Sequence, residues 1–282
     1  KRYDELLGDD LASESVRSAT EGAQRVLKNA QRQAGCSHIN ILSVLGYCSD
    51  DDPPTLSSLW LVMPLIDEGS LHAAVHGPGD KKEHISRVFK DSRRAVALVD
   101  VFAGVSAGLA HMHTRREPLL HLDLKPANIL ISRLPGGFLQ PKLCDFDAAR
   151  SMGNSSSSAM TNGTWVYMAP ERFRDPVEAA PSPDAPPADV YSFGMVMYEC
   201  TTGLRPFREL TSAPQVWIAV DRGQRPSFEA ETDYKDLIEQ CWAASAVERP
   251  QSTDVAQYFL TEMEKVRFPK LEKAPGSNDM VP

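Results

Sequence analysis

The stretch HLDLKPANIL, from His121 to Leu130, decides the fold together with KLCDFDAAR, from Lys142 to Arg150. The first stretch contains Asp123 and Asn128, and the second contains Asp145. Apolar residues follow Asn128 and precede Asp145, so two short strands joined by a turn are expected between them. Such a hairpin would bring the three polar side chains to the same end.

These side chains suit chemistry on phosphates. A carboxylate such as that of Asp123 can accept the proton of an attacking hydroxyl. The amide oxygen of Asn128 and the carboxylate of Asp145 are hard oxygen ligands, which Mg²⁺ prefers. Lys125 lies between the first two residues and can offset the charge of a phosphate. The pattern therefore predicts phosphoryl transfer.

Both stretches resemble motifs of the eukaryotic protein kinases, namely the catalytic loop H-R-D-x-K-x-x-N and the D-F-G motif. Three further segments resemble family motifs and follow in the family's order. They are MAPER (168–172), DVYSFGMVMYE (189–199) and CWAASAVERP (241–250). The resemblance covers about residues 36–265. It implies an α+β fold with two lobes, as in protein kinases.

The chain is expected to divide into two parts. Residues 1–76 would form a reduced small lobe with a long helix, two antiparallel strands and a nucleotide hinge. Residues 77–282 would form a helical large lobe that carries the catalytic loop and the activation segment. Apolar periodicity predicts strands within 39–48 and 59–66, and helices over 13–34, 92–113, 188–202, 234–243 and 253–266.

The resemblance implies a role for each residue of the first two motifs. Asp123 would orient and deprotonate the acceptor hydroxyl, and Lys125 would stabilise the transferring phosphoryl group. Asn128 and Asp145 would bind Mg²⁺. A lysine two residues after the aspartate is the family's Ser/Thr signature, so the implied reaction transfers the γ-phosphoryl group of ATP to serine or threonine in protein substrates.

The resemblance also implies a nucleotide pocket. Met63 would be the gatekeeper, and backbone groups of Pro64 and Ile66 would meet the adenine ring. Proline lacks a backbone N–H, but the implied contact needs only the carbonyl of Pro64. Leu130 would form the floor under adenine.

Other positions match or depart from the family's pattern. Glu171 and Arg249 resemble its structural ion pair, and Asp189 resembles the residue that braces the catalytic loop. Leu122 stands where the family has an arginine that reads a phosphate on the activation segment, so we expect packing to position that segment. Asp147 replaces the glycine of D-F-G and adds a third carboxylate beside the expected Mg²⁺.

The N-terminal region departs most, because it contains no G-x-G-x-x-G loop and no V-A-I-K motif. The candidates for the phosphate-contacting lysine are Lys1 and Lys28. Its glutamate partner would be Glu14 or Glu21, whereas the family's usual distance, counted back from SHINIL, leads to Asn29. The sequence does not choose among them.

Two explanations for the missing loop remain open at this point. Either the given sequence omits the loop, or the protein has none. The second resembles a group of divergent secreted apicomplexan kinases and pseudokinases without a Gly-rich loop. Membership would imply a parasite-vacuole location; otherwise a cytoplasmic location is expected. The five cysteines show no CxxC spacing and are expected to be buried free thiols, with a bridge between Cys200 and Cys241 as the alternative if the protein is secreted.

Composition argues against several other classes. The net charge of −8 and the pI near 5.4 disfavour a nucleic-acid partner. We expect no transmembrane segment, because no apolar run approaches the roughly 18 residues that a span needs. Basic residues between 81 and 94 are expected to form a solvated face, with a docking or membrane-associated partner as the alternative.

The sequence therefore predicts a divergent Ser/Thr protein kinase that uses ATP and Mg²⁺. The alternative is a pseudokinase that acts as a binding scaffold or an allosteric partner. In that alternative, Asp123, Asn128 and Asp145 persist only as a hydrogen-bonding framework.

Overall fold

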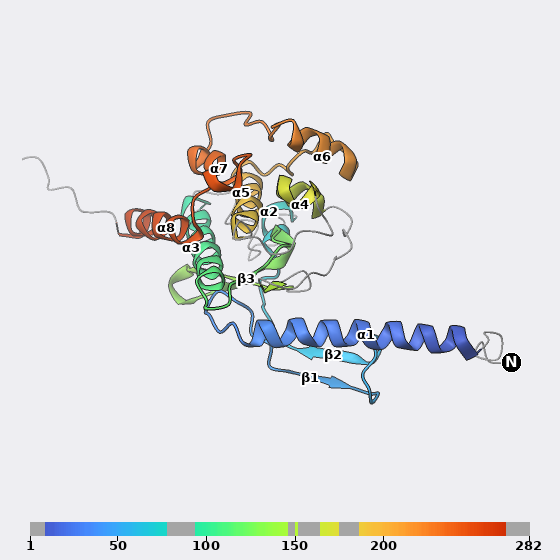
Figure 1. The fold of residues 1–282 in the computed structure, drawn as a ribbon. Helices are drawn as coiled ribbons and strands as arrows, with labels where there is room; N and C mark the ends of the chain where they lie inside the picture. Colours follow the sequence, from blue (N-terminus) through green and yellow to red (C-terminus); the bar gives the residue numbers. More distant parts are fainter. Residues whose placement is uncertain (1–8, 78–93, 146–149, 152–163, 175–185, 269–282) are drawn as a thin grey trace, which may run out of the picture.

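A computed structural model describes residues 9–77, 94–145, 150–151, 164–174 and 186–268. These residues form a small lobe with one helix and a strand pair, and a larger lobe that is mostly helical (Figure 1). The expected α+β architecture with two lobes is therefore correct. Lys1, Asp147 and the basic residues 81–93 lie outside the described residues.

The small lobe consists of α1 (Asp9–Ala34) and the antiparallel pair β1 (Gly46–Ser49) and β2 (Leu59–Val62). The helix was expected over 13–34 and begins earlier. Strand β2 lies inside its expected range, whereas β1 begins late in its range and ends one residue beyond it; each strand is only four residues long.

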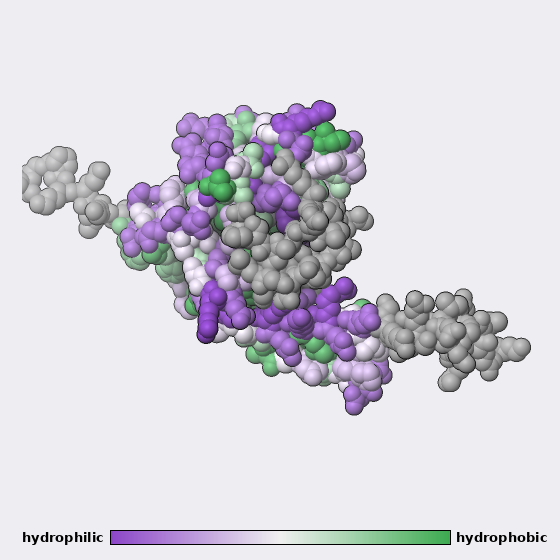
Figure 2. All heavy atoms as spheres, viewed as in Figure 1, coloured by the Kyte–Doolittle hydropathy of each residue, from purple (hydrophilic) through white to green (hydrophobic). Residues whose placement is uncertain are grey.

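The strand pair lies beside α1 and leaves large apolar side chains in solvent. Tyr47 is 58% exposed and Trp60 is 62% exposed. Figure 2 shows hydrophilic residues along the visible face of α1, with hydrophobic residues exposed beside it. A two-stranded pair is marginally stable alone, and the segment between its strands approaches α1 where Leu56 lies next to Gly22.

The large lobe is built around two buried helices, α3 and α5. The rings of Phe102 on α3, Phe193 on α5 and Phe259 on α8 pack against one another at centroid distances of 5.3 to 6.2 Å. The helices of this lobe are α2 (Leu71–His76), α3 (Arg94–His113), α4 (Pro170–Arg174), α5 (Pro186–Thr202), α6 (Ala213–Asp221), α7 (Lys235–Cys241) and α8 (Ser252–Arg267).

Among the helices that the structure describes, α3 is long and apolar enough to cross a membrane by length and composition. No such stretch was expected from the sequence. In the structure, 61% of the apolar stretch of α3 is buried inside the protein. Its apolar residues therefore serve as the centre of the core, in contact with α5 and α8.

The predicted hairpin is present as β4 (Ile129–Arg133) and β5 (Leu139–Leu143), which pair antiparallel with Ile129 opposite Leu143. The hairpin packs on α3, where Gly104 faces Pro141. A second short pair joins β3 (Leu119–Leu120) to β6 (Arg150–Ser151). Single 3₁₀ turns complete the described elements: η3 (Pro126–Asn128), η4 (Pro135–Gly137), η6 (Thr164–Tyr167) and η7 (Ala246–Glu248).

Cys200 and Cys241 are free and buried, as expected from the sequence, so the alternative of a bridge between them is wrong. Cys241 packs on α5 at Gly194, 3.0 Å from where a Cβ on that glycine would lie. Cys200 lies six residues further along α5, which is about 9 Å at 1.5 Å per residue. Cα atoms joined by a disulfide lie within about 7 Å, so the two thiols sit at different levels of the helix.

Candidate active site

The catalytic loop is tied together by its own side chains. Lys125 Nζ donates to Asp123 Oδ2 at 2.7 Å. The amide nitrogen of Asn128 donates to the backbone oxygen of Asp123 at 2.9 Å and to its Oδ2 at 3.0 Å. The ammonium group of Lys125 and the amide group of Asn128 therefore both donate to Oδ2 of Asp123. These bonds fix the orientation of the Asp123 carboxylate before substrate binds.

The β4–β5 hairpin brings Asp145 to the same end as this loop. The backbone N–H of Cys144 donates to the backbone oxygen of Asn128 at 3.0 Å. Asp145 follows directly, exposed, with a left-handed φ of 63°. The short turn that sequence spacing predicted thus places Asp123, Asn128 and Asp145 on neighbouring backbone segments.

A buried carboxylate from α5 supports the loop from below. Asp189 accepts hydrogen bonds from the backbone N–H groups of His121 at 2.8 Å and Leu122 at 2.7 Å. It also bonds His113 Nε2 at 2.9 Å. Burial alone would raise the pKa of Asp189, but the bonds and charges of His113 and His121 outweigh it and hold the pKa below its ordinary value.

His121 and Leu122 are held inward. The His121 ring is buried, and its Nε2 lies 3.1 Å from the backbone oxygen of Cys144, which links the loop to the hairpin. Leu122 has a left-handed φ of 62° and packs against the hydrophobic core. An apolar side chain in that position cannot pair with a phosphate, as the sequence analysis expected.

The expected nucleotide hinge runs from β2 into α2. Met63 is 42% exposed and Pro64 is also exposed, while Ile66 is half-buried. Leu130 on β4 pairs with Ser70 through an isolated antiparallel bridge. The proposed floor residue therefore lies on a strand that is hydrogen-bonded to the end of the hinge segment.

The candidates on α1 for a phosphate-contacting pair lie in different settings. Asn29 is buried at 6% exposure, whereas Glu21 and Lys28 are exposed. Arg32 donates to Asn29 Oδ1 at 3.2 Å. Asn29 therefore stands at the position where the family's spacing places the glutamate. Its amide cannot form the ion pair that a glutamate carboxylate forms with the phosphate-contacting lysine.

The segment after the activation region is fixed by three contacts. Arg249 donates through two nitrogens to the two carboxylate oxygens of Glu171, at 2.7 and 2.9 Å. Tyr167 donates from its hydroxyl to Glu199 Oε2 at 2.6 Å, and its backbone oxygen accepts from Ser192 at 2.8 Å. The sequence motifs predicted the pair of Glu171 with Arg249, whereas no sequence signal pointed to Glu199, Ser192 or the contact of His113 with Asp189.

The donor set fits Mg²⁺ by its chemistry. Asn128 uses its amide nitrogen for both bonds to Asp123, so Oδ1 is its atom with metal-ligand character. Asp145 supplies a carboxylate from the adjoining backbone. Amide and carboxylate oxygens are the hard ligands that Mg²⁺ takes, usually with several waters.

A cavity of about 460 Å³ lies elsewhere, between α3, β5 and α8. Its lining includes Phe138, Leu260 and Met263 and none of the loop residues described above. It is therefore separate from the catalytic loop.

Comparison with known proteins gives the same family as the motifs. The chain is 28% identical over 288 residues to serine/threonine-protein kinase CTR1 of Arabidopsis thaliana, an alignment that covers 97% of the chain and 30% of that relative. It is 26% identical over 261 residues to dual specificity protein kinase pyk3 of Dictyostelium discoideum, covering 92% of the chain and 17% of the relative.

A third relative is receptor-interacting serine/threonine-protein kinase 2 of Bos taurus, 28% identical over 240 residues, with 80% of the chain and 41% of the relative covered. The chain spans less than half the length of each of these three relatives. The family model for the protein kinase domain matches residues 11–260. With its lobes, hairpin and braced loop in the arrangement described, the chain belongs to the protein kinase domain family.

Proposed function

We propose that this protein transfers the γ-phosphoryl group of ATP to serine or threonine hydroxyls of protein substrates. The observation that carries the proposal is the Asp123 carboxylate, held by Lys125 at 2.7 Å and by Asn128 at 3.0 Å, with Asp145 on the adjoining strand end. A general base must be oriented before the chemistry. Two donors on one oxygen give that orientation.

In this proposal, Asp123 accepts the proton of the attacking hydroxyl through its carboxylate. Lys125 balances negative charge on the transferring phosphoryl group. Asn128 Oδ1 and the Asp145 carboxylate would hold Mg²⁺, which neutralises charge on the phosphates. Catalysis of this type depends on positioning and electrostatics, so the braces from Asp189 and His121 support the reaction without touching the substrate.

The Ser/Thr preference rests on Lys125, which matches the family's Ser/Thr signature, and on two relatives that are serine/threonine-protein kinases by name. The adenine contacts proposed for Met63, Pro64, Ile66 and Leu130 rest on their place between β2 and β4. Lys1 is proposed as a phosphate contact only by its position in the sequence.

The second candidate function is a pseudokinase that acts through binding. Two observations favour it. Asn29 occupies the buried position on α1 where the family's spacing expects a glutamate, and Leu122 packs inward instead of reading a phosphate. Each charge-assisted bond to ATP that such a protein lacks would weaken nucleotide binding by about 1.5–3 kcal/mol.

Radioactive or mass-detected phosphate incorporation into the protein itself and into a generic substrate decides between the two. We expect incorporation with ATP and Mg²⁺, and a loss of at least about 100-fold in Asp123→Asn, because general-base catalysis contributes 10²–10⁴-fold. Asp254→Asn is the matched control, since Asp254 is exposed on α8. Equal background incorporation in wild type and Asp123→Asn would overturn the kinase proposal in favour of the pseudokinase.

A further inference from the structure

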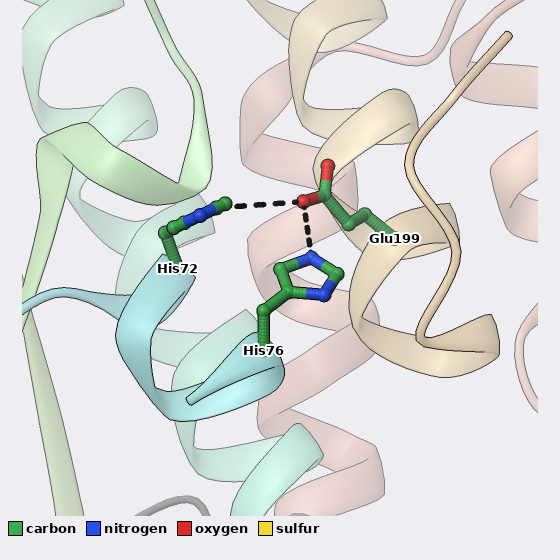
Figure 3. Close-up of side chains that lie close together, drawn as sticks. All are labelled: His72, His76 and Glu199. Carbon is green, nitrogen blue, oxygen red and sulfur yellow. Dashed lines mark hydrogen bonds and ion pairs between the residues drawn. The ribbon is translucent and has the colours of Figure 1, made fainter. Parts of the chain in front are cut away.

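Two histidines on α2 and a glutamate on α5 converge outside the catalytic loop (Figure 3). His76 Nε2 lies 2.8 Å from Glu199 Oε1, and His72 Nδ1 lies 3.9 Å from the same oxygen. The potential ligand atoms of all three residues lie within 4.8 Å of one another. Three groups with metal-ligand chemistry thus point at one small volume.

The local sequence explains why both histidines face the same way. Residues four apart lie on one face of a helix, so His72 and His76 are neighbours, with ring centroids 4.9 Å apart. Ser70 caps the helix by accepting from the N–H of Ala73 at 3.3 Å. Leu71 is fully buried, which anchors the adjoining face of α2 and places the histidines beside α5.

The two oxygens of the Glu199 carboxylate contact different neighbours. Its side chain is 1% exposed, and its Oε2 accepts from the Tyr167 hydroxyl at 2.6 Å. Burial, followed by the charge of Glu199, raises the pKa of Tyr167, so that hydroxyl remains a donor. Oε1 is then the oxygen directed at the histidines. Because the negative charge of Glu199 is buried, it requires a compensating partner.

We propose that His72, His76 and Glu199 form a Zn²⁺ site that joins α2 to α5. Two imidazole nitrogens and one carboxylate oxygen are a common protein ligand set for Zn²⁺, with water in the fourth position. Nitrogen donors favour such transition metals over Mg²⁺ or Ca²⁺. The site is independent of phosphoryl transfer and of the oxygen ligands proposed for Mg²⁺.

The three ligand atoms, which lie within 4.8 Å of one another, must change position to hold the ion. Tetrahedral Zn²⁺ with bonds of about 2.0–2.1 Å places its ligand atoms roughly 3.4 Å apart, between the two distances observed from Glu199 Oε1. The side chain of His72 is 57% exposed and that of His76 is 29% exposed. Both rings border solvent, so they can rotate toward the ion and water can complete the coordination.

Calorimetric titration of the metal-free protein with ZnCl₂ tests the proposal. The background is Cys48→Ser, because Cys48 is an exposed thiol that could bind Zn²⁺ by itself. We expect one saturable site per chain. In His72→Ala and in His76→Ala the affinity should fall at least about tenfold, since even supporting residues of metal sites are worth 10–100-fold.

His38→Ala is the matched control, because His38 stacks on His111 away from this cluster. The Zn²⁺ affinity of this variant should equal that of the Cys48→Ser background protein. Melting curves without Zn²⁺ verify the fold of each variant. His72→Ala is the most informative, since that side chain is more than half exposed and its removal should leave the melting temperature unchanged. Absence of saturable binding, or equal affinity in the histidine variants, would overturn the proposal.

Discussion

At the scale of single residues, the position of the catalytic loop depends on Asp189. Its carboxylate accepts from the N–H groups of His121 and Leu122. In Asp189→Asn one acceptor oxygen becomes a donor, so at least one buried N–H loses its partner, at a cost of about 1–3 kcal/mol. Denaturant unfolding should show a loss of that size in Asp189→Asn, and a change under about 0.5 kcal/mol in the surface variant Asp254→Asn.

The same residue predicts how stability responds to acid. The folded-state pKa of Asp189 is lowered, because the contacts of His113 and His121 outweigh burial. A carboxylate with a lowered folded pKa contributes stability above its unfolded pKa, about 3.9, and that contribution is lost as pH falls through the folded pKa. The stability gap between wild type and Asp189→Asn should therefore stay constant near neutral pH and shrink below about pH 4. A gap that stays unchanged down to pH 2 would count against this account.

Residue-scale contacts differ in how far the sequence can predict them. The Asp123, Asn128 and Asp145 cluster follows from a short loop and one hairpin, so spacing and residue type were sufficient. The bond of His76 to Glu199 joins residues 123 positions apart, and that of His113 to Asp189 joins residues 76 apart. Those contacts arise from helix packing, and no local pattern in the sequence encodes them.

At the scale of elements, the approach of α3 to the β4–β5 hairpin depends on a glycine. A Cβ on Gly104 would lie 2.4 Å from Pro141 Cγ and 2.6 Å from Asn40 Nδ2. That amide also donates to the Pro141 oxygen at 2.9 Å, so neither neighbour can move freely. We expect Gly104→Ala to lower the free energy of unfolding by about 1–3 kcal/mol through overpacking, measured by denaturant titration.

Gly22 on α1 provides the matched control. A Cβ there would meet the end of the Leu56 side chain, which is 49% exposed and can rotate away. Alanine is favoured over glycine inside a helix by about 0.5–1 kcal/mol, so Gly22→Ala should leave stability equal or slightly higher. Equal effects of the two substitutions would show that helix propensity, and not the packing of α3 on the hairpin, governs Gly104.

The elements that the sequence predicted are those with long apolar periodicity. The expected helices over 92–113 and 253–266 correspond to α3 and α8 within two residues at each end. Helices α2, α4 and α6 have six, five and nine residues and were missed. The seven-residue α7 was predicted, but over the longer range 234–243. Strands β1 and β2 are shorter than their apolar runs, because strand ends are set by pairing with a partner and not by hydrophobicity.

At the scale of the whole molecule, the reactivity of the five cysteines shows which thiols the folded core shields from solvent. Cys48 is exposed, whereas Cys36, Cys200 and Cys241 are buried and Cys144 is half-buried. Burial raises the pKa of Cys144 and of Cys241 to about 12, and it also raises the pKa of Cys36 and Cys200. Because the thiolate is the reactive form, these four should react slowly while the fold is intact.

Maleimide labelling followed by intact-mass measurement tests this arrangement. At pH 8 the native protein should gain one label rapidly, at Cys48, and Cys48→Ser should remove that fast label. In denaturant without reductant, all five thiols should react, because no cysteine is bridged. Three labels in denaturant would instead indicate a disulfide and would contradict the placement of Cys200 and Cys241 at different levels of α5. Fast native labelling of several thiols would show that the buried core opens far more readily than its packing implies.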